Sequence, residues 1–402
     1  MGEWFKKLIA GEAFFLERLT QDDWEGFIAF AARQGLAPVL YHVLKESPPA
    51  SLAASQLQEL SEIYLGSAHR NLILYHELGK VLRGFQEEGI PVIVLKGACL
   101  AKAVYENIAL RSMGDVDLLV RRADLGKTAQ VLRRHGYTAG YDFQVENEAA
   151  IHCHLPPMRG SRKLTIEVHW TIFDFTRFAA LEEEEMDHVW ARAQPLNIEN
   201  VPCLMLAPED MILHLCIHIS RQHLFDMRLR GFLDLRQVCK RYGETIVGDA
   251  LWQRASQWRV RRAVALTAFL AERWVGLGLG EDSRHLRDLE RPDPEIMAWI
   301  EKKILAESSL GMGVELPEFV AGKSYKQRLR VLWRRLFPPR ATLARLYKIN
   351  PASGIIYFFY PVRWFNLGRR FGPTVWRAWN GDQTVVGPLH QENALRNWLS
   401  RA

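Results

Sequence analysis

The sequence is poor in cysteine and has no long apolar run. Its five cysteines include no Cys-x-x-Cys pair and follow no regular spacing, so we expect reduced thiols in a cytoplasmic protein and no disulfide framework. The N-terminal residues lack the apolar stretch and the cleavage site of a secretory signal. No apolar stretch approaches the roughly 18–20 residues that span a bilayer. We therefore expect a soluble protein, which could still bind peripherally to the inner membrane surface.

Acidic residues are missing from one long segment near the C-terminus. Between Phe319 and Gly381 the sequence holds thirteen Lys or Arg and no Asp or Glu, so this segment carries +13 and the rest of a chain of net charge +6 carries −7. Aromatic residues are interleaved with the cations, as in Arg363-Trp364-Phe365.

Three interpretations of residues 319–381 stay open. Cations mixed with aromatic side chains suit an anionic membrane surface. They also suit single-stranded nucleic acid, which we consider the weaker candidate partner. The third interpretation is a helical appendage whose aromatic side chains pack on the main body. In each case we expect the segment to determine location or partner and to take no part in chemistry.

The spacing of apolar residues changes along the chain and predicts four parts. Residues 1–90 repeat at the helical period, and residues 91–200 alternate short β-branched runs with helical patterns, which predicts an α/β core. Residues 201–318 are helical again, and the basic segment, residues 319–402, follows. The fold class is thus α+β, with a mixed sheet between helical regions. The strands predicted in the core are Pro91–Leu95, Val116–Val120, Ala149–Leu155 and Leu164–Ile172.

Two aspartates stand at the entrance of the second predicted strand. Side chains alternate between the faces of a strand, so Asp115 and Asp117 project from one face while Val116 and Leu118 pack on the other. Two adjacent carboxylates repel each other unless a cation neutralises them, and Mg²⁺ prefers hard oxygen ligands of this kind. The alternative is a strand end whose carboxylates are simply solvated.

Two further stretches carry candidate site residues. The last predicted strand contains Glu167 among apolar neighbours, with His169 on the same face, so Glu167 could complete a three-acid site. Taken alone, Glu167 could equally be an edge-strand acid that faces water. Lys96 and Gly97 follow the first predicted strand and open a helix, where backbone N–H groups and the Lys96 ammonium suit a phosphate. A Lys-Gly pair at this place is also common as a plain turn.

Two pairs of histidines have the spacing of metal ligands, but structural roles are the more common explanation for such pairs. His152 and His154 alternate along a predicted strand and could join His169 in a zinc site, although such pairs are mostly packing residues. His214 and His218 share one face of a helix. The zincin motif needs glutamate directly after the first histidine, and leucine stands there, which excludes a metalloprotease of that type.

Several of these motifs occur together in one known family. They are Leu95-Lys96-Gly97, Arg111 with Gly114-Asp115-Val116-Asp117, Glu167-Val168-His169-Trp170, Pro208-Glu209-Asp210 with His214 and His218, and Arg230 with Asp234. In order and spacing, over roughly residues 20–260, the sequence resembles the bacterial uncharacterised nucleotidyltransferases of the DNA polymerase β superfamily, which are related to abortive-infection nucleotidyltransferases. The departure is Lys96-Gly97-Ala98, where the superfamily usually has Gly-Ser. Arg230 and Asp234, four residues apart, could simply form an ion pair along one helix.

The resemblance implies a nucleotidyltransferase-like sheet and a metal-dependent transfer chemistry. The carboxylates implied to hold Mg²⁺ or Mn²⁺ and to act in catalysis are those of Asp115, Asp117 and Glu167. The residues implied to bind the phosphates of an NTP are Lys96, Gly97, Arg111 and Ser112. His169 is implied to orient the acceptor or a neighbouring carboxylate.

We therefore predict an enzyme that moves a nucleoside monophosphate from an NTP to a hydroxyl of a small molecule, lipid-linked sugar, peptide or protein. The alternative is a catalytically weak binding or regulatory module that keeps the fold and docks an anionic partner through residues 319–381. The missing serine of the Gly-Ser turn favours the binding module, and the three carboxylates favour the enzyme, because a carboxylate cluster is costly to retain without an ion. Transfer to an RNA end is a third hypothesis, which depends on the basic segment alone.

Overall fold

The computed structural model describes most of the chain. The described residues are 1–277 apart from 13, 163, 173–182 and 247, then 291–305, and 333–400 apart from 334, 335, 339, 348 and 350–352. They divide into two compact units, Met1–Glu290 and Arg291–Arg401, which we describe separately. No helix among the described residues is both long and apolar enough to cross a membrane.

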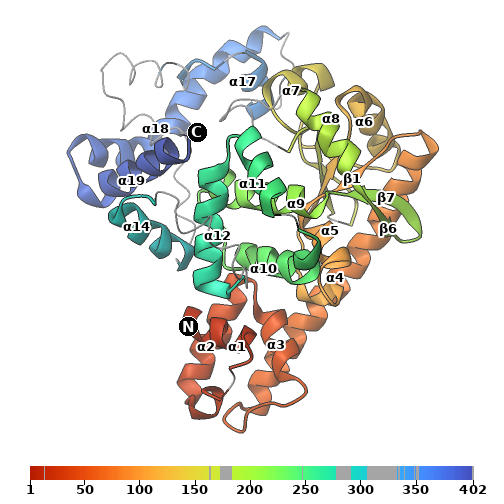
Figure 1. The fold of residues 1–402 in the computed structure, drawn as a ribbon. Helices are drawn as coiled ribbons and strands as arrows, with labels where there is room; N and C mark the ends of the chain where they lie inside the picture. Colours follow the sequence, from red (N-terminus) through yellow and green to blue (C-terminus); the bar gives the residue numbers. More distant parts are fainter. Residues whose placement is uncertain are drawn as a thin grey trace. The chain divides into compact units, whose positions relative to one another are not determined.

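The first unit begins with helices, as the apolar spacing predicts. Its long helix α4 packs against α2 and α3 at one end and reaches the sheet strands β6 and β7 at the other (Figure 1). Thr20 caps α2 through a reciprocal pair of hydrogen bonds with Asp23, and Gly35 ends that helix in the left-handed conformation. The helices of this region are α1 (Gly2–Ile9), α2 (Gln21–Gln34), α3 (Ala37–Leu44) and α4 (Ala54–Glu87).

A seven-stranded mixed sheet follows, with helices around it, so the predicted α+β class is confirmed. The strand order is β3-β4-β5-β2-β1-β7-β6, and β2 runs parallel to β5 in the middle of the sheet. The strands are β1 (Ile93–Val94), β2 (Asp115–Leu119), β3 (Thr138–Ala139), β4 (Met158–Arg159), β5 (Thr165–His169), β6 (Gln194–Ile198) and β7 (Val201–Met205). The helices among them are α5 (Lys96–Ala103), α6 (Leu125–Arg134), α7 (Val145–Ile151) and α8 (Glu183–Arg192).

The structure corrects one predicted strand and adds a hairpin. Most of the predicted strand Ala149–Leu155 is not a strand: its first residues belong to α7, whose acidic first turn suits a helix N-terminus, and His154 makes only an isolated bridge to His169. The hairpin β6–β7 turns through Glu199 and Asn200, both with positive φ, as a two-residue type I′ turn requires. Strand β7 pairs with β1 and extends the sheet.

Helices after β7 complete the first unit. Pro208 stands in the first turn of α9, together with Glu209 and Asp210, where proline and acidic side chains suit a helix N-terminus. Asp210 is fully buried and pairs with Arg192 and Arg254 at 2.9 and 3.1 Å, which joins α9 to α8 and α11. The elements are α9 (Pro208–Ile217), a π-helical turn η4 (His218–Gln222), α10 (Arg230–Tyr242), α11 (Gly248–Gln257) and α12 (Arg261–Val275).

The second unit contains the described part of the basic segment, whereas residues 319–332 lie outside the described residues. Its small apolar cluster consists of Leu343, Ala344 and Ile356, against which Tyr347, Phe359 and Tyr360 pack. The helices are α14 (Pro294–Leu305), α17 (Arg340–Tyr347), the 3₁₀ turn η7 (Gly354–Phe358), α18 (Phe359–Trp379) and α19 (Gln383–Ser400).

Candidate functional site

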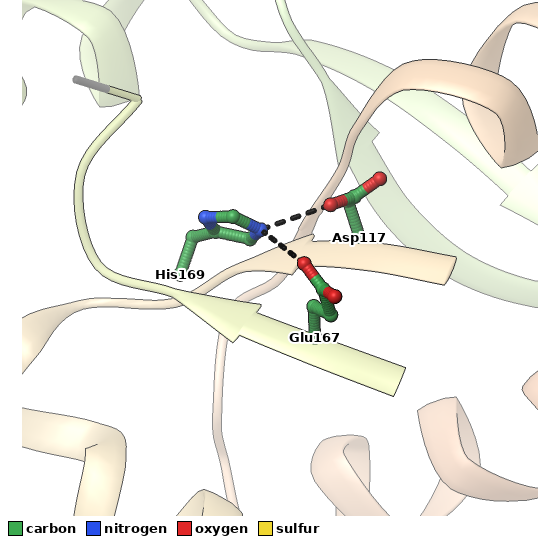
Figure 2. Close-up of side chains that lie close together, drawn as sticks. All are labelled: Asp117, Glu167 and His169. Carbon is green, nitrogen blue, oxygen red and sulfur yellow. Dashed lines mark hydrogen bonds and ion pairs between the residues drawn. The ribbon is translucent and has the colours of Figure 1, made fainter. Parts of the chain in front are cut away.

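The candidate site lies on two neighbouring strands in the middle of the sheet. In the parallel pairing of β2 with β5, Asp117 lies directly opposite Glu167. The alternate positions on both strands, Val116 and Ile166 among them, are fully buried and pack on the other face of the sheet. Strand alternation and the register therefore bring two carboxylates from residues fifty positions apart side by side, as Figure 2 shows.

Asp117 is the centre of a short-range polar network. Its Oδ1 accepts hydrogen bonds from Lys96 Nζ at 2.8 Å and from His169 Nε2 at 2.9 Å. The same His169 nitrogen lies 3.8 Å from Glu167 Oε2 (Figure 2). Asp117 and His169 are both less than one tenth exposed. Among the described residues, Asp117, Glu167 and His169 form the one group whose ligand atoms all lie within 4.8 Å of one another, as a shared metal ion requires.

The carboxylates of the site differ in how easily they ionise. Burial and the charge of Asp117 raise the pKa values of both Asp115 and Glu167. Burial also raises the pKa of Asp117, but Lys96 and the hydrogen bond from His169 outweigh it, so the pKa of Asp117 is well below its usual range. Burial lowers the pKa of His169 to about 4, against the hydrogen bond to Asp117, so the ring is neutral near pH 7. The site thus carries more negative charge than Lys96 alone neutralises.

A divalent cation fits this donor set. The donors are carboxylate oxygens and a neutral imidazole, which are protein ligands of divalent ions. Burial and the charge of Asp117 keep the pKa values of Asp115 and Glu167 raised even though Lys96 is nearby, and a bound cation would offset both effects. Lys96 has a φ of 45°, an uncommon value for a residue with a side chain, at the point where β1 leads into α5. This backbone conformation places its ammonium group against Asp117.

Arg111 is held by a buried ion pair, which the sequence did not indicate. Its Nε and Nη2 donate to the carboxylate of Asp234 at 2.8 to 3.1 Å, and its Nη1 donates to the carbonyl oxygen of Ser112 at 2.7 Å. Tyr105 donates to the same carboxylate at 2.7 Å. Asp234 therefore forms its ion pair with Arg111, from another part of the chain, rather than with Arg230 on the same helix. Asn71 also donates to the Arg111 carbonyl, so α4 and α10 together fix the loop that leads into β2.

The site opens into a cavity of about 440 Å³. Lys96, Gly97, Arg111, Asp115, Asp117, Glu167 and His169 all line it, whereas Ser112 does not and contributes its backbone carbonyl to the neighbouring arginines. A side chain at Gly97 would come within 3.2 Å of Met113, so glycine permits the close approach of the Arg111 loop.

The cavity is also lined by residues that sequence reasoning did not assign to the site: His218 and Arg230 were named only within the family motifs, and Gln222 and His223 were not named. His218, Gln222 and His223 come from the π-helical turn and its end, and Arg230 comes from the first turn of α10. His218 Nδ1 donates to Gln222 Oε1 at 2.6 Å. Burial and the neighbouring Arg111 lower the pKa of Arg230 to about 10, so it remains a cation near pH 7. A π-helical turn, common at functional sites, has no sequence periodicity of its own that would have revealed it.

The comparison with known protein families agrees with this geometry. The chain belongs to a family described as uncharacterised nucleotidyltransferase, whose model matches residues 20–276. The match covers the sheet and all the cavity-lining residues, and it ends before the second unit. No curated protein and no solved structure gives a significant match. The predicted family is thereby confirmed.

Proposed function

We propose that the protein is a metal-dependent nucleotidyltransferase that moves a nucleoside monophosphate from an NTP to a hydroxyl acceptor. The observation that carries the proposal is the cross-strand pair Asp117 and Glu167, with Asp115 beside it, at the edge of a cavity large enough for a small ligand. The acceptor would be a small molecule, a lipid-linked sugar, a peptide or a protein.

In this proposal an acceptor oxygen forms a bond to the α-phosphorus while the bond from that phosphorus to the bridging oxygen breaks. Pyrophosphate leaves, and the proton of the acceptor hydroxyl passes to a site carboxylate or to water. Mg²⁺ or Mn²⁺ held by Asp115, Asp117 and Glu167 would neutralise the phosphates and stabilise the charge that develops in the transition state.

Side chains of this chain supply the remaining charge and orientation. Lys96 lies next to the carboxylates and would contact the phosphates as a point charge. Arg230 also lines the cavity and is the better candidate for a second phosphate contact. Asp234 and Ser112 bind all three guanidinium nitrogens of Arg111. Arg230, by contrast, has a longer hydrogen bond, from Nη1 to the Ser112 carbonyl oxygen at 3.3 Å. Arg111 would then act by holding the loop before β2. In the absence of an ion, His169 orients Asp117 through its hydrogen bond.

A binding or regulatory module without turnover is the second candidate. The observation that favours it is the direct ion pair between Lys96 and Asp117, which already neutralises one carboxylate of the site. Ala98, where the superfamily usually has serine, removes a hydroxyl from the same turn.

Incubation with each α-phosphate-labelled NTP, a divalent ion and cell lysate separates the two candidates. We expect one lysate component to become labelled and pyrophosphate to be released in equal amount. Heat-treated protein is the control. The lysate is tested as separate soluble and membrane fractions. If the protein binds nucleotide but transfers label from none of the four NTPs in either fraction, the result supports the binding module instead.

A further inference from the structure

The structure points to two properties beyond the transfer reaction itself. The first concerns the metal and rests on the proposed function. The second concerns the C-terminal unit and is independent of it.

His169 occupies a ligand position in the metal group. Its Nε2 lies 2.9 Å from Asp117 Oδ1, close to the separation of about 3 Å between neighbouring donors around an ion with bonds of about 2.1 Å. The distance of 3.8 Å to Glu167 Oε2 is less than twice that bond length of about 2.1 Å, so one ion can contact both atoms. Binding through Nε2 requires the ring proton on Nδ1, so the metal would replace the proton that now points at Asp117.

A nitrogen donor changes which ion the site prefers. Mg²⁺ takes oxygen ligands and gives up its water reluctantly, whereas first-row transition ions accept imidazole together with carboxylate. We infer that His169 is a metal ligand and that the site therefore prefers Mn²⁺ to Mg²⁺. The alternative role is that His169 only orients Asp117 by donating its hydrogen bond.

Electron spin echo spectroscopy of the full chain with bound Mn²⁺ tests this inference, because a coordinated imidazole gives a nitrogen modulation. We expect that modulation in the natural protein and in His154→Gln, a neighbouring cavity histidine whose ring centre lies 5.2 Å from that of His169. We expect its loss in His169→Gln, with Mn²⁺ binding weakened about ten- to hundredfold.

The ion preference provides a second measurement. At equal concentration, Mn²⁺ should raise the melting temperature more than Mg²⁺, and His169→Asp, with an all-oxygen site, should reverse that order. Bound Mn²⁺ without nitrogen modulation, or a preference that His169→Asp leaves unchanged, would overturn the inference while leaving the nucleotidyltransferase proposal intact. Binding of Mg²⁺ alone would also overturn the inference, and if neither ion binds, both proposals fail.

The second property lies in the exposed aromatic surface of the C-terminal unit. Phe358, Phe365 and Trp376 are each about seventy per cent exposed. By contrast, Ile356 and Phe359, which lie close to Phe358 in the chain, pack in the small apolar cluster. The appendage interpretation requires the aromatic side chains of this segment to be packed. Several of them are exposed instead, so that interpretation does not account for them.

The exposed side chains share one face of α18 with a cation. Phe365, Arg369 and Trp376 are separated by four and seven residues, which places them within about 40° of one another around the helix. All three are exposed. Arg340 and Arg363 belong to the same unit, whose basic segment contains no acid between Phe319 and Gly381. Large apolar side chains set among cations are typical of helices that lie in the surface of an anionic bilayer.

We propose that this face of α18, defined by Phe365, Arg369 and Trp376, binds an anionic lipid surface. Charge complementarity favours this occupant. Single-stranded RNA offers the same negative charge, but it gains from stacking on aromatic rings, whereas a bilayer accepts any apolar side chain. The exposed aliphatic side chains of Leu346 and Ile355 in the same unit favour the bilayer, because they add apolar surface but no ring on which a base could stack.

Flotation of the full chain with vesicles tests the proposal. We expect binding to phosphatidylcholine vesicles that contain phosphatidylglycerol, little binding to phosphatidylcholine alone, and steep weakening between low and high salt. Phe365→Ser with Trp376→Ser should weaken vesicle binding about tenfold or more, and Arg363→Gln with Arg369→Gln should weaken it as well. Leu65→Ser with Leu72→Ser, which removes exposed leucines from α4, is the matched control and should have no effect.

Leucine variants separate lipid from RNA. Phe365→Leu with Trp376→Leu should retain vesicle binding, since leucine is apolar, and should lose any RNA binding that depends on stacking. The proposal would be overturned in favour of nucleic acid if the natural protein binds RNA, the leucine variant does not, and neither binds anionic vesicles. Failure to bind either ligand, or binding insensitive to salt, would also overturn it.

Discussion

Replacing both Asp115 and Asp117 by asparagine should reduce nucleotidyl transfer by about a thousandfold or more, because each carboxylate contributes to the charge that holds the metal and the phosphates. The same change should abolish the rise in melting temperature that Mn²⁺ and a non-hydrolysable NTP cause in the natural protein. At ligand concentrations a hundredfold above Kd that stabilisation is about 2.7 kcal/mol, which thermal unfolding measures readily.

The single variants should differ in their stability without ligand. The pKa of Asp115 is raised, so its ionised form opposes folding near pH 7, and Asp115→Asn should leave the melting temperature equal or higher. The pKa of Asp117 is lowered, so its ionised form favours folding, and Asp117→Asn should lower the melting temperature. A ligand-induced shift that survives the double change would place the nucleotide elsewhere, and equal losses of stability in both single variants would contradict the electrostatic account.

Asp234→Ala should lower the free energy of unfolding by about 3–5 kcal/mol, because it leaves the buried guanidinium of Arg111 without its carboxylate partner. The two side chains are 8% and 2% exposed, and Tyr105 loses its hydrogen-bond acceptor as well. Urea or guanidinium unfolding of the full chain measures the change.

Two further variants serve as controls for the stability loss in Asp234→Ala. Asp187→Ala breaks an ion pair whose side chains are 46% and 64% exposed, and it should cost at most about 1 kcal/mol. Arg111→Met with Asp234→Leu removes both charges and should recover much of the stability lost in Asp234→Ala. If Asp234→Ala and Asp187→Ala cost the same, the buried pair does not hold the loop before β2 as the structure indicates.

The sequence by itself determined the fold class and the family, both of which are confirmed. It also placed Asp115 and Asp117 on one strand face, since the alternation of side chains along a strand is a local property. The helices of residues 1–90 followed from local patterns in the same way. Local patterns were insufficient at Ala149–Leu155, where a short apolar stretch is compatible with both helix and strand.

Only the tertiary structure decided which distant residues meet at the site. The register of β2 against β5 brings Glu167 opposite Asp117, and the packing of α10 brings Asp234 to Arg111, 123 residues away in the chain. The π-helical turn that carries His218 and Gln222 into the lining of the cavity is likewise a product of packing. Such contacts depend on how whole elements pack, and the spacing of residues within one element holds no information about its neighbours in space. The sequence could therefore name the carboxylates, but only the fold supplies their partners and the rest of the cavity lining.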